Sequence, residues 1–331
     1  MHRKGTGGSP ERTNYAMLGV DVAKLTLAAA FCDPVSRTIL WEIEVPNTPA
    51  GIARVLARTP AHTPLVVEPT GRYSLPLVQA ATAAAFPVRL AQPRRAKAFL
   101  AAVSPRAKTD RLDSRGLARY GVRADLPPYP LKTEVMDQLD QLLAARRGLS
   151  QALMQLRQQQ QRLPYAAAAL EPAVASLTAE RTRLDQQIAQ HSAAAADLVP
   201  VIAALDAIPG VGAVTAVTLA STLLSHTFPT SGAFVAYVGL DVRVRDSGKH
   251  RGKRKVSKQG NAELRRLLYL CAQASLRAKA SPFRAQYERE RAKGLTSTAA
   301  LVAVARKLAK VAWSMVRHGA TFDPGRVYRQ P

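Results

Sequence analysis

Residues 16–31 read AMLGVDVAKLTLAAAF, an apolar stretch that contains one acidic residue, Asp21. The stretch predicts two strands, over 16–22 and 25–31, joined by a short turn. A third strand is predicted over 39–45, and connections this short indicate antiparallel pairing. The chain therefore begins its folded part with three antiparallel strands.

Further along the chain, short apolar strands are predicted over 65–67 and 87–91. Helices are predicted to begin after Thr48 and after Tyr73, and a basic loop is predicted over 94–108. Strands that alternate with helices in this way indicate a mixed α/β sheet with helices on its faces.

Further acidic residues stand at sites where a metal-dependent nuclease would need them. Glu68 follows the apolar strand Leu-Val-Val, and Asp110 and Asp113 follow Thr109, which can cap a helix. A spacing of three places the two aspartates on one helix face. In a ribonuclease-H-like sheet, an Asp on the first strand, a Glu after a later strand and an Asp pair on a helix can converge.

Converging carboxylates can hold two Mg²⁺ ions for phosphodiester chemistry. Each residue also has a plainer interpretation. Asp21 can begin a turn, Glu68 can end a strand in solvent, and Asp110 and Asp113 suit an exposed helix N-terminus. The residues alone leave both interpretations open.

Charge narrows the class of partner. The 331 residues include 47 Lys+Arg against 23 Asp+Glu, for a formal net charge of +24. Such an excess predicts a polyanion partner, most simply nucleic acid, with an anionic membrane surface as the rival. No apolar run approaches the roughly 20 residues of a spanning helix. Residues 1–14 are expected to form a disordered basic tail and not a secretory signal.

Cysteine usage predicts a reducing compartment. Cys32 and Cys271 are the only two cysteines, too few for a disulfide framework or a four-cysteine zinc site. The expected location is the bacterial cytoplasm, in association with the nucleoid.

A heptad pattern begins near residue 131. Apolar residues recur at alternating spacings of four and three in two blocks, separated by Pro164. Polar residues interrupt the pattern at Arg146, Gln160 and Arg181. The pattern predicts two long antiparallel helices. Their interpretation as a coiled-coil arm that oligomerises competes with that of a plain helical hairpin.

A second compact domain is predicted from residue 199. Ile-Pro-Gly-Val-Gly, ending in Gly210 and Gly212, leads into an apolar helix. This is typical of a helix-hairpin-helix element that grips a phosphate of DNA, and equally of an ordinary turn between helices. Helices over 263–279 and 296–317 complete the domain.

The most basic stretch, 239–266, lies between these helices. It contains no interleaved aromatic residues for base stacking and does not fit the phosphate-binding loop spacing. It contains two serines, Ser247 near its start and Ser257 among lysines. The candidate nucleic-acid contacts here, beside Gly210 and Gly212, are Arg243, Arg245, Lys249, Arg251, Lys253, Arg254 and Lys258.

These motifs together resemble a known family. GVDVAK around Asp21, VEPTG around Glu68 and KTDRLD around Asp113 look like the DEDD signature of the insertion-sequence transposases numbered one-ten, with their eleven-eleven subgroup. IPGVG, AYVGL, DSG, SKQGN and LRR follow in the family's order in the C-terminal half. The resemblance spans nearly the whole chain, and Pro69 after Glu68 departs from the small residue often found there.

The resemblance implies an α/β RuvC-like N-terminal domain, a coiled-coil middle and a mainly α C-terminal transposase domain. It implies Asp21, Glu68, Asp110 and Asp113 as Mg²⁺ ligands and Ser247, in preference to Ser257, as nucleophile. It further implies a tetramer that recombines donor and target DNA under the guidance of an element-encoded bridge RNA. The corresponding segments are a tail over 1–14, a RuvC-like domain over 15–128, a coiled-coil hairpin over 131–197 and a transposase domain over 199–325.

Two other functions fit the residues less completely. A Holliday-junction-like nuclease would use the same four carboxylates with water as nucleophile, and would form no protein–DNA adduct. A non-enzymatic nucleic-acid-binding protein would use the carboxylates only as ion-pair partners, and would show no Mg²⁺-dependent strand cleavage.

Overall fold

The computed structural model describes residues 16–103, 110–130, 132–243, 246–247, 250–251, 255–277 and 281–327. At Val103, Asp110, residues 246–247 and residues 250–251 it describes backbone alone. The chain forms two compact units, Met1–Leu131 and Lys132–Pro331, each with apolar clusters of its own. The predicted tail over 1–14 and the predicted cap Thr109 lie outside the described residues.

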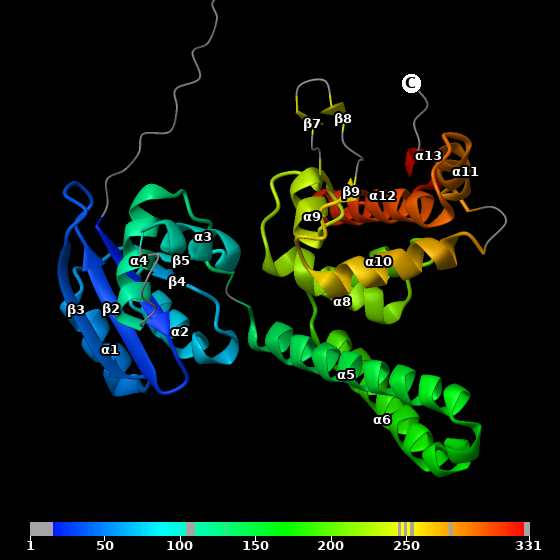
Figure 1. Cartoon of the computed structure of the whole chain (residues 1–331), viewed down its shortest axis with the longest axis horizontal. Helices are drawn as coiled ribbons and strands as arrows, with labels where there is room; N and C mark the ends of the chain where they lie inside the picture. The colour runs from blue at the N-terminus through cyan, green and yellow to red at the C-terminus, as the bar shows by residue number, and fades with distance from the viewer. Residues whose placement is uncertain are drawn as a thin grey trace, which may run out of the picture. The chain divides into compact units, whose positions relative to one another are not determined.

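The first unit is built on a five-stranded sheet (Figure 1). Its strands are β1 (Met17–Val22), β2 (Thr26–Cys32), β3 (Ile39–Pro46), β4 (Leu65–Val67) and β5 (Val88–Leu90). The strand order is β3-β2-β1-β4-β5, with β1–β3 antiparallel and β4 and β5 parallel to β1. The predicted antiparallel start is confirmed, and the mixed order is that of a RuvC-like, ribonuclease-H-like domain.

Helices cover both faces of this sheet. They are α1 (Pro49–Arg58), the 3₁₀ turn η1 (Gly71–Tyr73), α2 (Leu75–Ala83), α3 (Pro93–Val103) and α4 (Asp110–Arg123). Thr48 caps α1 through a bond from the Gly51 amide, as predicted. Alternate strand residues divide between two cores, because successive side chains of a strand point to opposite faces. Leu18 and Val20 pack with α1 and α2, whereas Met17 and Val66 pack with α3 and α4.

Residues 94–103 are helical and not part of the predicted loop, whose remaining residues, 104–108, lie outside the described ones. Pro93 begins α3, a position that suits proline because the first helical amides need no partner. Ala96 is buried, and Phe99 stacks at a tilt on Tyr120 of α4, with ring centroids 5.3 Å apart. The arginines and the lysine therefore lie on the outer face of an amphipathic helix. Its few apolar residues are outnumbered by charged ones, so its helical pattern was not evident in the sequence.

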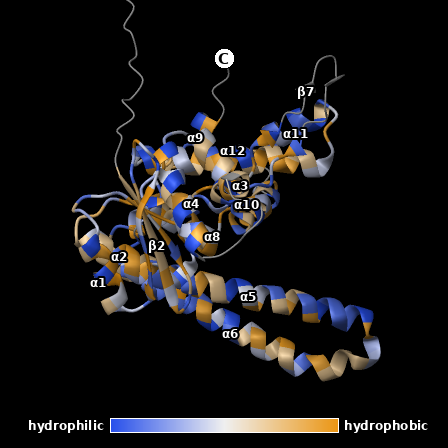
Figure 2. Ribbon diagram, turned by 60° about the vertical axis from the view of Figure 1, so that its left-hand side comes forward, coloured by the Kyte–Doolittle hydropathy of each residue, from blue (hydrophilic) through white to orange (hydrophobic). Residues whose placement is uncertain are grey.

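In the second unit, two long helices form a hairpin (Figure 1): α5 (Glu134–Arg162) and α6 (Ala167–Ala194), joined by η2 (Pro164–Ala166). Apolar and hydrophilic residues alternate along both (Figure 2). Two of the polar breaks pair across the hairpin. Arg146 forms an ion pair with Asp185, and Gln160 donates to Glu171 at 2.8 Å. These polar positions therefore set the register within one chain, and coiled-coil assembly between chains stays a prediction.

The rest of the second unit is a cluster of helices around one apolar core. Its helices are α7 (Val199–Asp206), α8 (Ala213–Ser225), α9 (Ser231–Val238), α10 (Ala262–Ser275), α11 (Arg284–Ala292), α12 (Ser297–His318) and α13 (Pro324–Val327). The helices α9, α11 and α13 were not predicted from the sequence, and all three are short. Of α10's predicted extent, residues 276–277 lie beyond the helix.

Between α9 and α10 the basic stretch forms two small strand pairs: β6 (Val242–Arg243) with β9 (Lys255–Val256), and β7 (Asp246–Ser247) with β8 (His250–Arg251). We call this segment, 242–256, the ribbon.

Cys32 and Cys271 are both buried and unbridged, and burial raises the pKa of each thiol. Within the described residues, no helix is both long and apolar enough to span a membrane.

Candidate active site

Asp21 and Glu68 lie at neighbouring ends of two parallel strands. The register pairs Val20 of β1 with Val67 of β4, so the next residues along the two strands are Asp21 and Glu68. Because parallel strands end at the same edge of a sheet, the two carboxylates are brought together although 47 positions separate them. Both residues are partly exposed, and both have interaction partners.

The strand alternation directs both carboxylates to the face covered by α4. Met17 and Val66 pack on that face. Asp21 is four residues beyond Met17 and Glu68 two beyond Val66, so each shares its neighbour's side of the sheet. The opposite face is apolar and packed against α1 and α2.

Gly19 brings the start of α4 close to this edge. A Cβ at Gly19 would lie 2.4 Å from the Ser114 carbonyl oxygen and 2.2 Å from the Ala118 amide nitrogen, so only glycine allows this approach. Further along α4, Gly121 approaches the side chain of Met17. The helix therefore runs antiparallel to β1, and its N-terminus points toward the strand end that carries Asp21.

Ion pairs hold α4 in this position. Arg115 binds Glu42 of β3 through two hydrogen bonds, of 2.5 and 2.7 Å, and Arg111 binds Glu44 at 3.4 Å. The hydrogen bond from Arg115 lowers the pKa of the Glu42 carboxyl. Since both pairs lie toward β3, the N-terminal turn of α4 is tied across the antiparallel half of the sheet.

Asp110 and Asp113 occupy that N-terminal turn. Asp110 is the first residue of α4, and the partly exposed Asp113 precedes Ser114, whose carbonyl contacts the Gly19 region. The backbone thus places the helical turn that carries Asp110 and Asp113 toward the sheet edge that carries Asp21 and Glu68. Within the described side chains, which exclude Asp110, no group of three acidic, histidine or cysteine residues is close enough to hold a metal ion.

The carboxylates nevertheless suit a hard divalent cation. Aspartate and glutamate oxygens are the ligands preferred by Mg²⁺, Mn²⁺ and Ca²⁺, and no imidazole or thiol competes among the four predicted positions. The described pair, Asp21 and Glu68, would supply ligands from rigid strand ends, as a preorganised site requires.

Ser247 lies in the ribbon of the second unit. It is the last residue of β7 and pairs with His250 of β8. The rival serine, Ser257, is 8 % exposed, and its hydroxyl donates to a carboxylate oxygen of Asp241. A buried hydroxyl that is already bonded cannot reach a phosphodiester, so the structure argues against Ser257 as the nucleophile.

The predicted nucleic-acid contacts are described only in part. Arg243 and Lys258 are exposed, and Arg251 lies in β8. Arg245, Lys249, Lys253 and Arg254 lie outside the described residues.

Gly210 and Gly212 have different roles. Gly210 has a left-handed φ of 89°, and a Cβ there would lie 2.4 Å from the Cys271 carbonyl oxygen and 2.5 Å from the Ser275 amide. Packing against α10 therefore explains this glycine without DNA. Gly212 begins α8 at a φ of −110°, and a Cβ added there would have no other atom within 4 Å. Helix-hairpin-helix binding by Gly210 and Gly212 stays a prediction.

Replacing Gly210 with alanine is expected to lower the free energy of unfolding by about 2 kcal/mol or more, because the methyl group meets backbone in a left-handed turn. Gly212→Ala is the matched control, and a change within about 0.5 kcal/mol is expected. Thermal unfolding of both variants provides the measurement. Equal melting temperatures for the two would contradict the packing role of Gly210.

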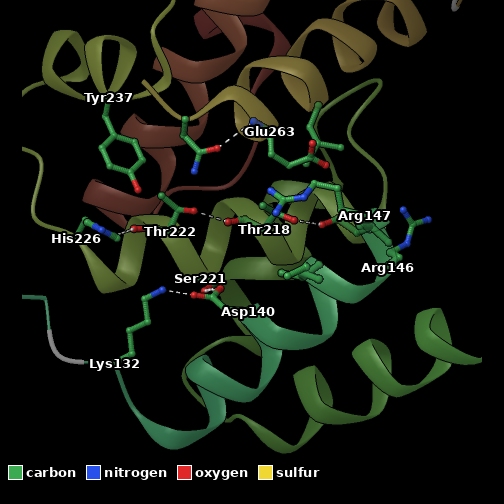
Figure 3. Close-up of a pocket in the computed structure, with 15 residues that line it drawn as sticks. Lys132, Asp140, Arg146, Arg147, Thr218, Ser221, Thr222, His226, Tyr237 and Glu263 are labelled. Atoms are coloured by element: carbon green, nitrogen blue, oxygen red, sulfur yellow. Dashed lines mark hydrogen bonds and ion pairs between the residues drawn. The ribbon is translucent and has the colours of Figure 1, made fainter. Parts of the chain in front are cut away.

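A polar pocket of about 240 Å³ lies between α5, α8, α9 and α10 (Figure 3). There the Asp140 carboxylate forms an ion pair with Lys132. It also accepts a hydrogen bond of 2.9 Å from the Ser221 hydroxyl. Glu263 pairs with Arg266 outside the pocket. The acidic groups are thus already satisfied, and the pocket joins the hairpin to the helical cluster. No local pattern indicated this pocket, because the bonded residues Asp140 and Ser221 are 81 positions apart.

His226, at one side of this pocket, makes stability depend on pH. Burial lowers the pKa of its imidazole below the usual value near 6.5, assisted by Lys132, and opposed by its bond to the Thr222 carbonyl and by Asp140. The folded state therefore favours the neutral ring, whereas the unfolded chain takes up a proton below about pH 6.5. Stability is present above that pH and is lost as pH falls toward the folded pKa.

We expect the melting temperature of the wild type to fall more than that of His226→Gln between pH 7.5 and pH 5.5. Each kcal/mol lost corresponds to about 2–4 °C in a domain of this size. Differential scanning calorimetry at both pH values measures the effect. The same pH dependence in both proteins would exclude His226 as its source.

Comparison with known proteins agrees with this architecture. Residues 18–163 match the DEDD transposase domain of IS110-type elements, described as "Transposase". Residues 202–288 match a second domain, described as "Transposase IS116/IS110/IS902 family". The chain belongs to this transposase family. It is thus an enzyme of the transposase and DNA recombinase class, as its sequence motifs predicted.

Relatives of this transposase include a pilin gene-inverting protein of Moraxella bovis, which is 26 % identical over 92 % of this chain and 97 % of its own length. An IS110 protein of Streptomyces coelicolor is 34 % identical over 38 % of this chain and 31 % of its own. Among solved structures, T. thermophilus RuvC in complex with a Holliday junction substrate is similar to this chain. The match covers 34 % of this chain and 99 % of the RuvC chain. Its identity is 17 % and its TM-score 0.29.

Proposed function

We propose that this transposase cuts and rejoins DNA through a covalent phosphoserine intermediate, with Asp21, Glu68, Asp110 and Asp113 as ligands of divalent metal ions. The observation that supports it best is the juxtaposition of Asp21 and Glu68 on the α4 face. A glycine contact brings the helix that carries the other two aspartates to the same edge.

The residues of the first unit would hold and orient the metal. Strand ends carry Asp21 and Glu68, and the N-terminal turn of α4 carries Asp110 and Asp113. When bound, Mg²⁺, in a pair of ions, would stabilise negative charge on the phosphate and on the oxygens that attack and leave. The ion pairs of Arg111 and Arg115 with β3 keep the helical ligands in register with the strand ligands.

The second unit would supply the nucleophile. The Ser247 Oγ attacks a DNA phosphorus, a bond forms between them, and the bond from phosphorus to the 3′ oxygen breaks. The serine proton ends on that oxygen, leaving a free 3′-OH and a phosphoserine. Because the ester is conserved, a second 3′-OH can displace the serine without ATP. Burial of Ser257 supports the choice of Ser247.

We further propose that an element-encoded bridge RNA selects the donor and target DNA. Charge supports this, since a net charge of +24 without interleaved aromatics in the basic stretch suits backbone contacts and not base reading. The Moraxella relative, a gene-inverting protein, supports DNA inversion or insertion as the outcome. Such a reaction would take place in the cytoplasm, at the nucleoid.

A tetramer assembled through the hairpins is the proposed active form. The tip of the hairpin supports it: Leu163 is 53 % exposed, Met154 55 % and Tyr165 fully exposed. Apolar side chains gathered at one exposed end are typical of a contact surface.

The test incubates the protein with RNA from the flanks of its element, labelled donor and target DNA, and either Mg²⁺ or EDTA. Denaturing gels are run before and after protease treatment. A protease-sensitive labelled adduct that requires Mg²⁺ is expected. Mg²⁺-dependent cleavage without an adduct would instead indicate a nuclease that uses water, and no cleavage with any divalent ion would refute the proposal.

A further inference from the structure

Two cationic side chains, Arg243 and Lys255, lie opposite each other at the base of the ribbon, and Lys258 follows three residues after Lys255. In the pairing of β6 with β9, Val242 lies opposite Val256 and Arg243 lies opposite Lys255. Directly opposite residues share one face of a strand pair. Val256 packs against the helical core. Arg243 and Lys255 therefore face the other way, and both are exposed.

This arrangement places like charges side by side. Like charges directly opposite each other destabilise a strand pair. Among the described residues, none of Arg243, Lys255 and the nearby Lys258 takes part in an ion pair. Their repulsion is thus unrelieved within the described part of the chain, and an anion on this face would relieve it.

The backbone beneath the cations is fixed to the end of α9. Ser257 donates two hydrogen bonds to Asp241. Its hydroxyl donates to the Asp241 carboxylate, and its amide donates to the Asp241 carbonyl oxygen at 2.8 Å. The Lys258 amide donates to the Gly239 carbonyl at 3.1 Å. Gly260 packs so closely that a Cβ would lie 2.2 Å from the Tyr237 carbonyl oxygen. These contacts join the AYVGL and SKQGN motifs into one rigid base.

Lys258 has a strained backbone conformation in that base. Its φ of 54° lies in the left-handed region, where glycine or asparagine would fit with less strain. Its side chain is exposed. A turn needed only for its shape would favour glycine, so the lysine is explained better by its charge.

We propose that Arg243, Lys255 and Lys258 form a binding site for the phosphodiester backbone of DNA. The proposal rests on the proposed function, because Ser247 stands four residues beyond Arg243 in the same ribbon and would act on DNA. Cations on a rigid backbone contribute affinity and orientation without reading sequence. The site would hold the strand beside the serine.

The test compares two full-length triple variants that each lose three positive charges. Arg243→Gln/Lys255→Gln/Lys258→Asn removes the site, and asparagine keeps the left-handed turn. The control, Arg157→Gln/Arg162→Gln/Lys310→Gln, changes exposed residues elsewhere in the second unit. Anisotropy of a labelled DNA duplex over a KCl series gives the slope of log affinity against log salt, and melting curves verify folding.

Each lost phosphate contact lowers that slope by about 0.9, so the site variant should lose about 2.7 and the control much less. Equal losses in both variants would overturn the site, as would a loss seen with an RNA duplex but not with DNA. Adduct formation by the wild type is scored in parallel. An adduct without the slope change rejects this site alone, and the slope change without an adduct rejects only the proposed chemistry.

Discussion

Replacing Ser247 with alanine is expected to abolish the protein–DNA adduct, by at least about 10³-fold, while DNA affinity stays within about twofold of the wild type. The reason is that alanine has no oxygen to attack phosphorus, whereas the cations that bind the DNA backbone remain. The measurement is the protease-sensitive band on a denaturing gel, with filter binding for affinity.

Ser257→Ala is the informative companion variant. Ser257 is buried and bonded to Asp241, so its loss should lower the melting temperature and weaken the base of the ribbon without removing the nucleophile. Some adduct should therefore remain. An adduct in Ser247→Ala and none in a folded Ser257→Ala would reverse the assignment of the nucleophile.

The second large effect is expected for Asp21→Asn. Asparagine keeps the size of the side chain but removes the charge that would bind a divalent cation, and strand cleavage should fall by at least about 10²-fold. Cleavage rates over a range of Mg²⁺ and Mn²⁺ concentrations measure it. Partial recovery at high metal concentration is expected, since a weakened site can still be filled.

The control for charge is Asp125→Asn, an exposed aspartate of the same unit that lies beyond the C-terminal end of α4, whereas Asp110 and Asp113 lie at its N-terminal end. It should cleave as the wild type does. If Asp21→Asn retained full cleavage with an unchanged melting temperature, the α4 face would not be the catalytic site.

Mixing the two inactive variants tests whether sites are shared between chains. Ser247→Ala retains the carboxylates and Asp21→Asn retains the serine. In a tetramer that pairs the carboxylates of one chain with the serine of another, the mixture should regain part of the adduct. A mixture as inactive as its components would indicate that each chain completes its own site.

Local patterns in the sequence were enough to predict most of the secondary structure of the first unit. Apolar runs and short turns predicted β1–β5 nearly to the residue; β1, β2 and β4 are buried, and therefore apolar, along most of their length. The segment of α3 was misjudged, since its few buried residues, such as Ala96, are outnumbered by charged ones. Short helices such as α9 were missed for the related reason that eight residues show little periodicity.

The candidate carboxylates could be named from their positions after apolar strands and at a helix start, but not brought together. Their proximity depends on parallel pairing of β1 with β4 and on the contact of Gly19 with α4, which join residues far apart in the chain. The same holds for the cation pair of Arg243 and Lys255, whose shared face depends on a register that no local pattern specifies.

Composition and local pattern thus sufficed for the class of partner, for the order of the strands along the chain and for naming the acidic residues that are proposed as ligands. Charge and periodicity are properties of neighbouring residues, and they need no tertiary contact to be expressed. Which faces these residues share, the burial of Ser257 and the packing role of Gly210 were decided by folding alone. Each depends on contacts between segments whose pairing is set by the burial of the whole core.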